Sequence, residues 1–472
     1  MADSVRGVRK AGAAAPGTRE ERIDLLGTAK LLQEGLTEAA CRAVFLMTRT
    51  TERAREWTLK ALADFWTAVV LRAPPSLTAA LVEAQESEVG GWPEIPATSR
   101  QGFFRRCKDL SWEFFAGLFR EFEAGMARVA EAVFVPEMAG LRERFAEVWA
   151  IDGSRLDAVA HRLKILWDVR SPVLPGCLEV CYDLFRGIPR VVLFHPDAAE
   201  AEMRRAEAVL PRVPAGSLLL GDRLYASVKL FHSLSERDVY GLFRRNRTIS
   251  LRKLRCLRRR RAAEGVLEDW LVEAGSGQTA PVQELRLILF RGKGKARREL
   301  LTNDLDPQHL AAEEALDLYP FRWTIERMYF DLKEVLDLHC FYAGNPNAVA
   351  MQVYAAAMVY AAMRVAQGRA AREAGVAPEA ISTAKLFPKV AAASYSWTII
   401  QLTVDAMRRA NPGVPLRTPD WRRRAFASVP LSAVAVEPRK GKRRKRRFCD
   451  ARRHWKSFAH VPGGPTLIRE LS

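Results

Sequence analysis

Residues 148–153 read Val-Trp-Ala-Ile-Asp-Gly, and this stretch decides the class of fold. Four apolar residues closed by Asp-Gly predict a short buried strand that ends in a turn at Asp152. Residues 217–222, Ser-Leu-Leu-Leu-Gly-Asp, repeat the pattern and predict a second strand that ends at Asp222. In α/β sheets, ligands bind at the carboxyl ends of the strands. The sequence therefore predicts two carboxylates side by side at one edge of a sheet.

The residues around these two strands complete an α/β pattern. Further strands are predicted at 177–184, 189–194 and 239–243 from their apolar and β-branched content. Helices are predicted from Asp197, as the capping residue, to Leu210, and again over 225–236. The predicted order over 146–243 is three strands, helix, strand, helix, strand.

The region before residue 146 has a different pattern. Apolar residues at three- and four-residue spacing predict helices over 37–60, 76–85 and 110–133. We therefore predict an all-helical N-terminal domain over residues 21–145. Residues 1–20 are rich in Ala, Gly and Arg, lack the apolar segment of a signal peptide and are expected to be disordered.

Two basic regions follow the α/β pattern. Residues 244–305 combine a dense run of arginines with strand-like stretches, and we interpret them as a basic β-rich insertion. Helical pattern resumes over 306–410, and its most apolar stretch, 351–366, fits a buried helix better than a membrane span. Residues 411–472 form a Pro- and Arg-rich tail that includes the basic tract 440–447. We expect a cytoplasmic, nucleoid-associated bacterial protein with no membrane partner.

The charge balance favours a polyanionic partner. The chain has 472 residues, and 74 Lys and Arg against 55 Asp and Glu give a formal net charge of +19. Such a surplus favours nucleic acid as the partner, although a basic enzyme from an arginine-rich proteome would have the same composition. Seven scattered cysteines argue against a disulfide framework. Cys177 and Cys181 lack a second pair at zinc-ligand spacing, so we expect buried strand residues there.

A third acid lies on a predicted helix. Arg322, Glu326 and Lys333 are spaced by four and seven residues, which places them on one helix face. Pro320 suits the first helical position, with Tyr319 as the preceding residue. One face then presents a carboxylate between two cations, a surface suited to a metal ion beside a phosphodiester. A simple surface ion pair of Arg322 with Glu326 is the alternative interpretation.

The segment from Tyr319 to Lys333, Tyr-Pro-Phe-Arg-Trp-Thr-Ile-Glu-Arg-Met-Tyr-Phe-Asp-Leu-Lys, resembles a known signature. It is similar to the Y-x2-R-x3-E-x6-K pattern of cut-and-paste DDE transposases of bacterial insertion sequences. Asp152 in Ile-Asp-Gly-Ser resembles the first acid of that family. Asp222 in Gly-Asp-Arg-Leu-Tyr resembles the second, with Leu224 where the family usually has the more permissive Gly. The resemblance covers roughly residues 146–370.

The resemblance implies a fold and a chemistry. The fold is an α/β RNase H-like core over 146–243 and 306–410, interrupted by the β-rich insertion. Three acids would hold two Mg²⁺ ions, for which Mn²⁺ would substitute, and act as the catalytic residues: Asp152, Asp222 and Glu326. The implied reaction is cleavage of transposon DNA ends followed by strand transfer into target DNA.

Double-stranded DNA is the implied partner, and the pairing of two transposon ends implies a homodimer in the DNA complex. Tyr319, Arg322 and Lys333 are predicted to contact the DNA beside the acids. Basic residues of the insertion are predicted to contact its phosphates: Arg252, Lys253, Arg255, Arg258, Arg259 and Arg260. The N-terminal helical domain is expected to bind the transposon ends.

Two other functions fit the same residues. One is a transposase-derived protein that binds DNA without cleaving it, and the other is a metal-dependent nuclease on the same fold. Asp152-Gly153 by itself is more often a turn than a catalytic pair. We prefer the catalytic interpretation because strand order, spacing and the helix face agree for all three acids.

Overall fold

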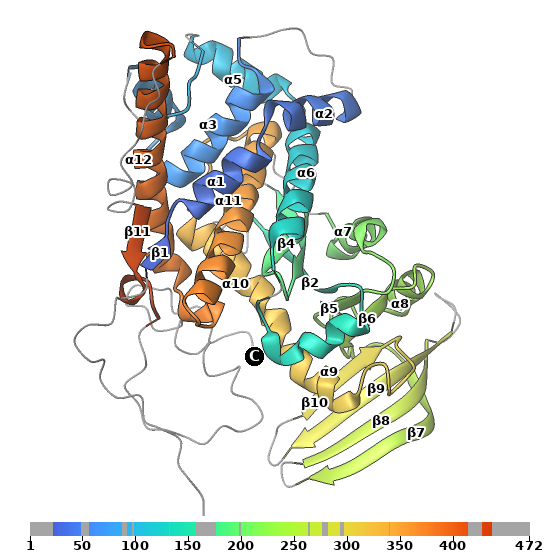
Figure 1. Cartoon of the computed structure of the whole chain (residues 1–472). Helices are drawn as coiled ribbons and strands as arrows, with labels where there is room; N and C mark the ends of the chain where they lie inside the picture. Colours follow the sequence, from blue (N-terminus) through green and yellow to red (C-terminus); the bar gives the residue numbers. More distant parts are fainter. Residues whose placement is uncertain are drawn as a thin grey trace, which may run out of the picture.

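A mixed sheet and a helical body, joined by one long helix, make up the molecule (Figure 1). The computed structural model describes residues 22–48, 56–86, 92–96, 99–131, 133–156, 176–197, 200–262, 265–275, 282–292, 297–338, 340–413 and 427–436. The expected disorder of residues 1–20 and the basic tract 440–447 lie outside the described residues.

The N-terminal region is helical, as its apolar spacing predicts. Its helices are α1 (Gly27–Gly35), α2 (Glu38–Thr48), α3 (Leu59–Arg72), α4 (Leu77–Glu86), α5 (Arg100–Asp109) and α6 (Glu113–Val129). The prediction of one helix over 37–60 was wrong, because the Thr58 side chain accepts a hydrogen bond from the Ala61 amide and caps a new helix, α3. Ser99 caps α5 in the same way through the Gly102 amide.

Nine strands form one continuous sheet. They are β2 (Val148–Arg155), β3 (Cys177–Asp183), β4 (Ile188–His195), β5 (Leu218–Gly221), β6 (Tyr240–Arg244), β7 (Leu251–Ala262), β8 (Gly265–Ala274), β9 (Gln283–Gly292) and β10 (Arg297–Thr302). Their order is β4-β3-β2-β5-β6-β10-β9-β8-β7. Strands β2, β5 and β6 run parallel, and the other neighbours pair antiparallel. The mixed α/β fold and the predicted strands are therefore confirmed.

The region predicted as a basic β-rich insertion continues this sheet. Strand β10 pairs with β6, with Leu301 opposite Phe243, and β7 to β9 follow outward as an antiparallel ribbon (Figure 1). An edge strand, β7, carries the run of arginines. Shared backbone hydrogen bonds therefore hold the ribbon in a fixed position relative to β2 and β5.

Two helices follow the strands of the α/β part: α7 (Glu202–Val209) and α8 (Val228–Ser235). The prediction that Asp197 caps the first of these was wrong. Helix α7 begins after Ala201, and the carbonyl of Asp197 instead accepts the thiol of Cys177. Cys177 and Cys181 are buried strand residues of β3, as predicted.

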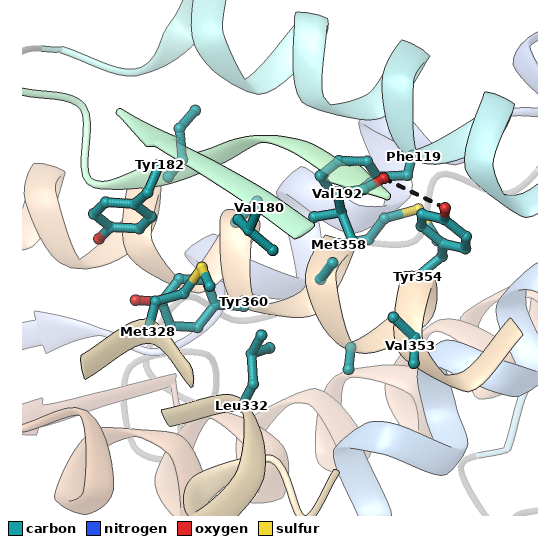
Figure 2. Packing of buried hydrophobic residues seen from close by; sticks show 14 of the residues in the cluster. Phe119, Val180, Tyr182, Val192, Met328, Leu332, Val353, Tyr354, Met358 and Tyr360 are labelled. Atoms are coloured by element: carbon teal, nitrogen blue, oxygen red, sulfur yellow. Dashed lines mark hydrogen bonds between the residues drawn. The ribbon is translucent and has the colours of Figure 1, made fainter. Parts of the chain in front are cut away.

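The long helix α11 (Pro346–Glu373) occupies the centre of the core. Asn345 caps it through the Ala348 amide, and Pro346 takes the first helical position. Figure 2 shows its Tyr354 and Tyr360 among side chains of β3, β4 and the helical segment that contains Met328 and Leu332. The helices α3 and α6 pack on the same core, so α11 ties the helical body to the sheet.

Helix α11 is apolar enough and long enough to cross a membrane, but its apolar window is entirely buried within the molecule. The predicted buried helix at 351–366 is therefore confirmed. Helix α12 (Thr383–Ala410) follows, and β11 (Ser428–Pro430) then pairs antiparallel with β1 (Arg22–Asp24). The described part of the predicted C-terminal tail is thus fixed to the start of the helical body.

One buried ion pair joins the ribbon to the segment that leads back to the core. Arg286 of β9 is fully buried and donates to the Asp269 carboxylate of β8 at 2.7 Å. It also donates to three backbone carbonyls, those of Asp304, Asp306 and Leu310. Removing one partner of such a pair leaves an uncompensated buried charge.

We expect Asp269→Asn to destabilise the protein by about 3–5 kcal/mol, because the Arg286 guanidinium would stay buried without its counter-charge. Urea unfolding of the full chain measures this. Glu273→Gln, which breaks the exposed pair of Glu273 with Arg252 on the neighbouring strand, is the matched control and should leave the unfolding midpoint unchanged. A loss below about 1 kcal/mol for Asp269→Asn would contradict the expectation.

Candidate active site

Two of the predicted acids lie on neighbouring parallel strands. Asp152 is in β2, and Asp222 directly follows β5. The two strands are in register up to Ala150, which faces Leu220, so both acids lie where this pairing ends. The parallel register of β2 and β5 places both aspartates at the same edge of the sheet, as predicted.

The third acid approaches from a helix. Glu326 lies in α10 (Thr324–Phe330), which packs against β2. The pKa of Asp152 is raised to about 7, chiefly by burial and also by the negative charges of Glu326, Glu202 and Asp222, against the opposing effect of Arg322. Burial and the charge of Asp222 likewise raise the pKa of Glu326, while Arg322 lowers it. The three predicted acids therefore lie within electrostatic reach of one another.

Arg322 is the cation between these acids. It is buried, and its Nη2 donates to Glu326 Oε1 at 2.7 Å. Its Nη1 lies 3.9 Å from Asp152 Oδ2. The guanidinium thus bridges the strand that bears one acid and the helix that bears another. The pair of Arg322 with Glu326 is largely shielded from solvent, unlike the surface ion pair of the alternative interpretation.

The helix that carries Glu326 differs from the regular helix predicted for 319–333. Helix α9 (Ala312–Leu318) runs directly into a 3₁₀ turn, η4 (Tyr319–Trp323), then into α10, and then into a π-helical turn, η5 (Asp331–Val335). The helical course thus begins at Ala312, and Tyr319 lies inside it rather than before it. Local π turns of this kind are frequent at functional sites.

Two residues predicted to contact DNA make hydrogen bonds to the protein itself. Lys333 Nζ donates to Ser154 Oγ at 2.7 Å and to the Arg155 carbonyl at 3.0 Å, and burial lowers its pKa. Tyr319 donates its hydroxyl to the carbonyl of Gly221 at 3.1 Å. Both bonds attach the 319–335 helical segment to the strand ends that bear the aspartates.

The structure also contains a cluster of polar residues behind Asp152 that was not predicted from the sequence. Glu179 of β3 is fully buried, and the Tyr225 hydroxyl lies 2.6 Å from its Oε1 and 2.9 Å from Oε1 of Glu202. Arg205 donates to the other oxygen of Glu179 at 3.3 Å. Burial raises the pKa of Glu179 to about 8, and the charge of Glu202 adds to that rise. One signal was present in the sequence: Glu179 interrupts an otherwise apolar strand.

Gly153 makes room for this cluster. A Cβ at that position would lie 2.9 Å from Glu179 Oε2, 3.0 Å from Arg205 Nη2 and 3.1 Å from Glu202 Cδ. These side chains are held by hydrogen bonds to one another and cannot easily move aside. The predicted end of the strand in a turn at Asp152-Gly153 was wrong, because β2 continues to Arg155 in its pairing with β3, and the glycine serves packing instead.

Acidic residues form ion pairs with most arginines of the basic tract on β7. Arg252 pairs with Glu273 at 2.7 Å, and Arg259 pairs with Glu268 at 3.3 Å. Both Arg258 and Arg260 reach Glu313, and Lys253 Nζ lies 3.9 Å from the centre of the Trp270 ring. Arg255 is exposed and has no such partner in the described part of the chain. The tract is thus an ordered surface, partly neutralised by acidic residues.

The acids suit a divalent cation in their chemistry. Each carboxylate has one oxygen engaged: Asp152 Oδ1 by the Gly153 amide, Asp222 Oδ1 by the Leu224 amide, and Glu326 Oε1 by Arg322. The second oxygen of each accepts no hydrogen bond from the described residues. Hard oxygen donors are what Mg²⁺ and Mn²⁺ prefer. Among the described residues, no three His, Cys, Asp or Glu side chains are close enough together to enclose an ion.

Known proteins are similar to the part of the chain that bears Asp222 and Glu326; the matched family segment begins after Asp152. Residues 176–362 match the family model described as the transposase DDE domain. The chain is 28% identical over 196 residues to a protein of Sinorhizobium fredii named as a transposase, covering 40% of this chain and 52% of that protein. It is 24% identical over 174 residues to an insertion-sequence transposase of Geobacillus stearothermophilus, covering 37% and 45%. The chain thus spans about half the length of the curated relatives it matches.

A solved structure also aligns with the chain. It is titled as a piggyBac transposase synaptic complex with hairpin DNA and covers 84% of this chain and 87% of its own. The sequence identity is 13% and the TM-score is 0.38.

The raised pKa of Asp152 predicts a pH dependence of stability in metal-free protein. Between about pH 4 and pH 7, the folded protein holds a proton on Asp152 that the unfolded chain has released. The resulting stabilisation is complete below about pH 4 and is lost as the pH rises through 7. Asparagine does not ionise. Asp152→Asn should therefore gain stability relative to wild type between about pH 4 and pH 8, on the order of 2–4 kcal/mol.

Urea unfolding in EDTA across this pH range measures the difference between the two proteins. Asp109→Asn, at an exposed position of α5, controls for the general effect of removing a carboxylate. A stability difference between Asp152→Asn and wild type that stays constant with pH would show that Asp152 does not take up a proton on folding.

Proposed function

We propose that the chain is a DDE transposase that cleaves DNA at the ends of a mobile element and joins the freed 3′ ends to target DNA; its motifs and the match of residues 176–362 to the transposase DDE domain support this. The observation that carries the proposal is the convergence of Asp152, Asp222 and Glu326 from two parallel strands and one helix, with Arg322 between them. Carboxylates that lie within electrostatic reach of one another and raise one another's pKa are costly unless the site uses them.

We also propose an RNase H-like catalytic core. Its support is the order β4-β3-β2-β5-β6, in which β2, β5 and β6 run parallel, together with the succession of three strands, helix, strand, helix, strand. Asp222 then lies at the carboxyl end of β5, where open α/β sheets bind ligands, and Asp152 lies in β2 just past the last residue that pairs with β5.

In the proposed reaction, divalent ions held by Asp152, Asp222 and Glu326 would activate the attacking oxygen and stabilise the leaving oxygen. The chain itself supplies cations to the same place. Arg322 lies between two of the acids, and its Nε is buried without a hydrogen-bond partner in the described structure. A phosphate oxygen is a suitable acceptor for that free donor.

Double-stranded DNA is the proposed partner, and two chains are expected in the complex because two element ends must be joined. Strand β7 is proposed to contact DNA phosphates through its arginines, which lie on the sheet that contains the acids. The N-terminal helices are proposed to bind the element ends. Where acidic partners already hold an arginine, phosphate binding would have to replace that ion pair.

Glu326→Gln tests the catalytic proposal. We expect wild type to nick a duplex carrying the gene's native flanking sequence at a fixed position with Mg²⁺ and not with EDTA. Glutamine keeps the shape of the side chain but removes its charge, so the cleavage rate should fall at least about 100-fold while the Kd for the duplex changes little. A gel assay gives the rate, and fluorescence anisotropy gives the Kd.

Glu334→Gln is the matched control, because Glu334 is an exposed glutamate four residues beyond α10. It should cleave at the wild-type rate. Binding without cleavage by wild type, with any divalent metal, would contradict the proposal and favour a DNA-binding protein that no longer cuts. Cleavage without joining to a target would favour a nuclease.

The dependence of DNA affinity on salt tests the proposed role of β7. Each phosphate contact removed lowers the slope of log K against log salt concentration by about 1. We expect this change for Arg255→Ala, because Arg255 is exposed and free of acidic partners among the described residues. Arg409→Ala, an exposed change at the end of α12 on the far side of the helical body (Figure 1), should not alter the slope. Equal slopes for both variants and wild type would remove β7 from the interface.

A further inference from the structure

Tyr329 connects the helix of one acid directly to the strand of another. Its hydroxyl donates to the carbonyl oxygen of Asp152 at 2.7 Å. Tyr329 lies in α10, three residues and nearly one turn after Glu326. The backbone of the first acid and the backbone of the third are therefore joined through one tyrosine side chain.

The position of Asp152 in β2 explains how a side chain from a helix reaches its carbonyl. Strand β5 pairs with β2 only as far as Ala150. Beyond that point β5 supplies no partner, and α10 approaches β2 in its place. Asp152 lies opposite Val180 of β3 at a hydrogen-bonded position of the ladder, so the Tyr329 hydroxyl is a second donor to a carbonyl that β3 already engages.

Burial makes this bond geometrically strict. Tyr329 is buried, and its ring belongs to the same core as Met328 and Leu332, which Figure 2 shows packed beside Tyr360 of α11. The ring therefore cannot swing away to find water. If the hydroxyl were absent, the Asp152 carbonyl would keep its ladder position opposite Val180, but α10 would lose one of its fixed attachments to β2.

We propose that Tyr329 is a positioning residue that sets the separation of Glu326 from Asp152 and so determines whether the acids bind a divalent cation together. The inference rests on the proposed function. Tyr329 touches no reacting group, and it acts through the backbone of Asp152. Of the other attachments of the segment, those of Arg322 to Asp152 and Lys333 to Ser154 involve charged side chains, and that of Tyr319 reaches β5 at Gly221 rather than β2.

The chain offers a close control for removing this hydroxyl. Tyr182 of β3 is also buried, and its hydroxyl donates to the carbonyl of Gly187 at 2.8 Å. Tyr329→Phe and Tyr182→Phe thus each remove a buried hydroxyl that donates to a carbonyl and keep the ring; Tyr182→Phe also removes contacts of its hydroxyl with Tyr360 and Arg364, so it is the more severe control for stability. The Tyr182 bond closes the turn between β3 and β4 and contacts none of the three acids.

The test is Mn²⁺ binding to the full-length protein, measured as the loss of the free Mn²⁺ signal in electron paramagnetic resonance. Residues that orient metal ligands typically change metal affinity by 10–100-fold when mutated. We expect Tyr329→Phe to raise the Kd for Mn²⁺ roughly 10-fold, Tyr182→Phe to leave it within about 2-fold of wild type, and Asp152→Asn to abolish binding. Replacing Tyr329 with 4-aminophenylalanine, which restores a donor at the same ring position, should recover most of the affinity.

The outcomes separate this inference from the proposed function. If wild type binds no Mn²⁺, or if Asp152→Asn binds it as wild type does, the metal site of the proposed function is wrong. If that site exists and Tyr329→Phe binds Mn²⁺ like wild type, only the positioning role fails. Equal weakening in both phenylalanine variants would also overturn it, because the effect would then be general loss of stability. Should Tyr329→Phe not fold, a folded 4-aminophenylalanine protein with weak Mn²⁺ binding would overturn it as well.

Discussion

The candidate active site depends on a fold that holds like-charged carboxylates near one another. Asp152, Asp222 and Glu326 come from separate parts of the chain, and each raises the pKa of a neighbour or has its own raised. Arg322 offsets part of this repulsion from a buried position between two of them. The three carboxylates have an unfavourable mutual electrostatic energy in the metal-free protein, and a bound cation would relieve it. The surrounding fold must supply the energy that keeps the acids in place.

Packing around α11 supplies that rigidity. Helix α11 lies in the core between the sheet, the N-terminal helices and the segment that bears Glu326. Parallel pairing of β2 with β5 holds the two aspartates, and the helical segment is attached to both strand ends by Tyr319, Tyr329 and Lys333. Because β10 pairs with β6, the basic strand β7 is part of the same rigid sheet. The cations on the ribbon therefore keep a constant position relative to the acids.

Local patterns in the sequence predicted the acids but not their supports. The apolar runs before Asp152 and Asp222 are strong signals because neighbouring residues set a buried strand, although β2 continues past Asp152 to Arg155 where a turn was predicted. The change from 3₁₀ to α to π geometry across Tyr319–Val335 has no such signal, since tertiary contacts with β2 determine it. The cluster around Glu179 likewise joins residues from β3, α7 and the turn after β5. Only the folded chain brings those residues together, as it does Tyr329 and the Asp152 carbonyl.

The pairing of β10 with β6 could not be predicted either, because the pattern of residues 244–305 indicates strands but does not indicate which strands they pair with. Asp197, by contrast, is a good capping residue that is not used as one, since α7 begins later at Glu202. Capping propensity is a local preference that the packing of the chain can override.

Anomalous diffraction from crystals of the full chain soaked in Mn²⁺ tests most directly whether Asp152, Asp222 and Glu326 form a metal site. The predicted result is a Mn²⁺ peak coordinated by carboxylate oxygens of Asp152, Asp222 and Glu326, with a shift of the Arg322 guanidinium away from Glu326. An ordered Mn²⁺ bound elsewhere, with Arg322 still between Asp152 and Glu326, would contradict the claim that these acids form a metal-dependent active site.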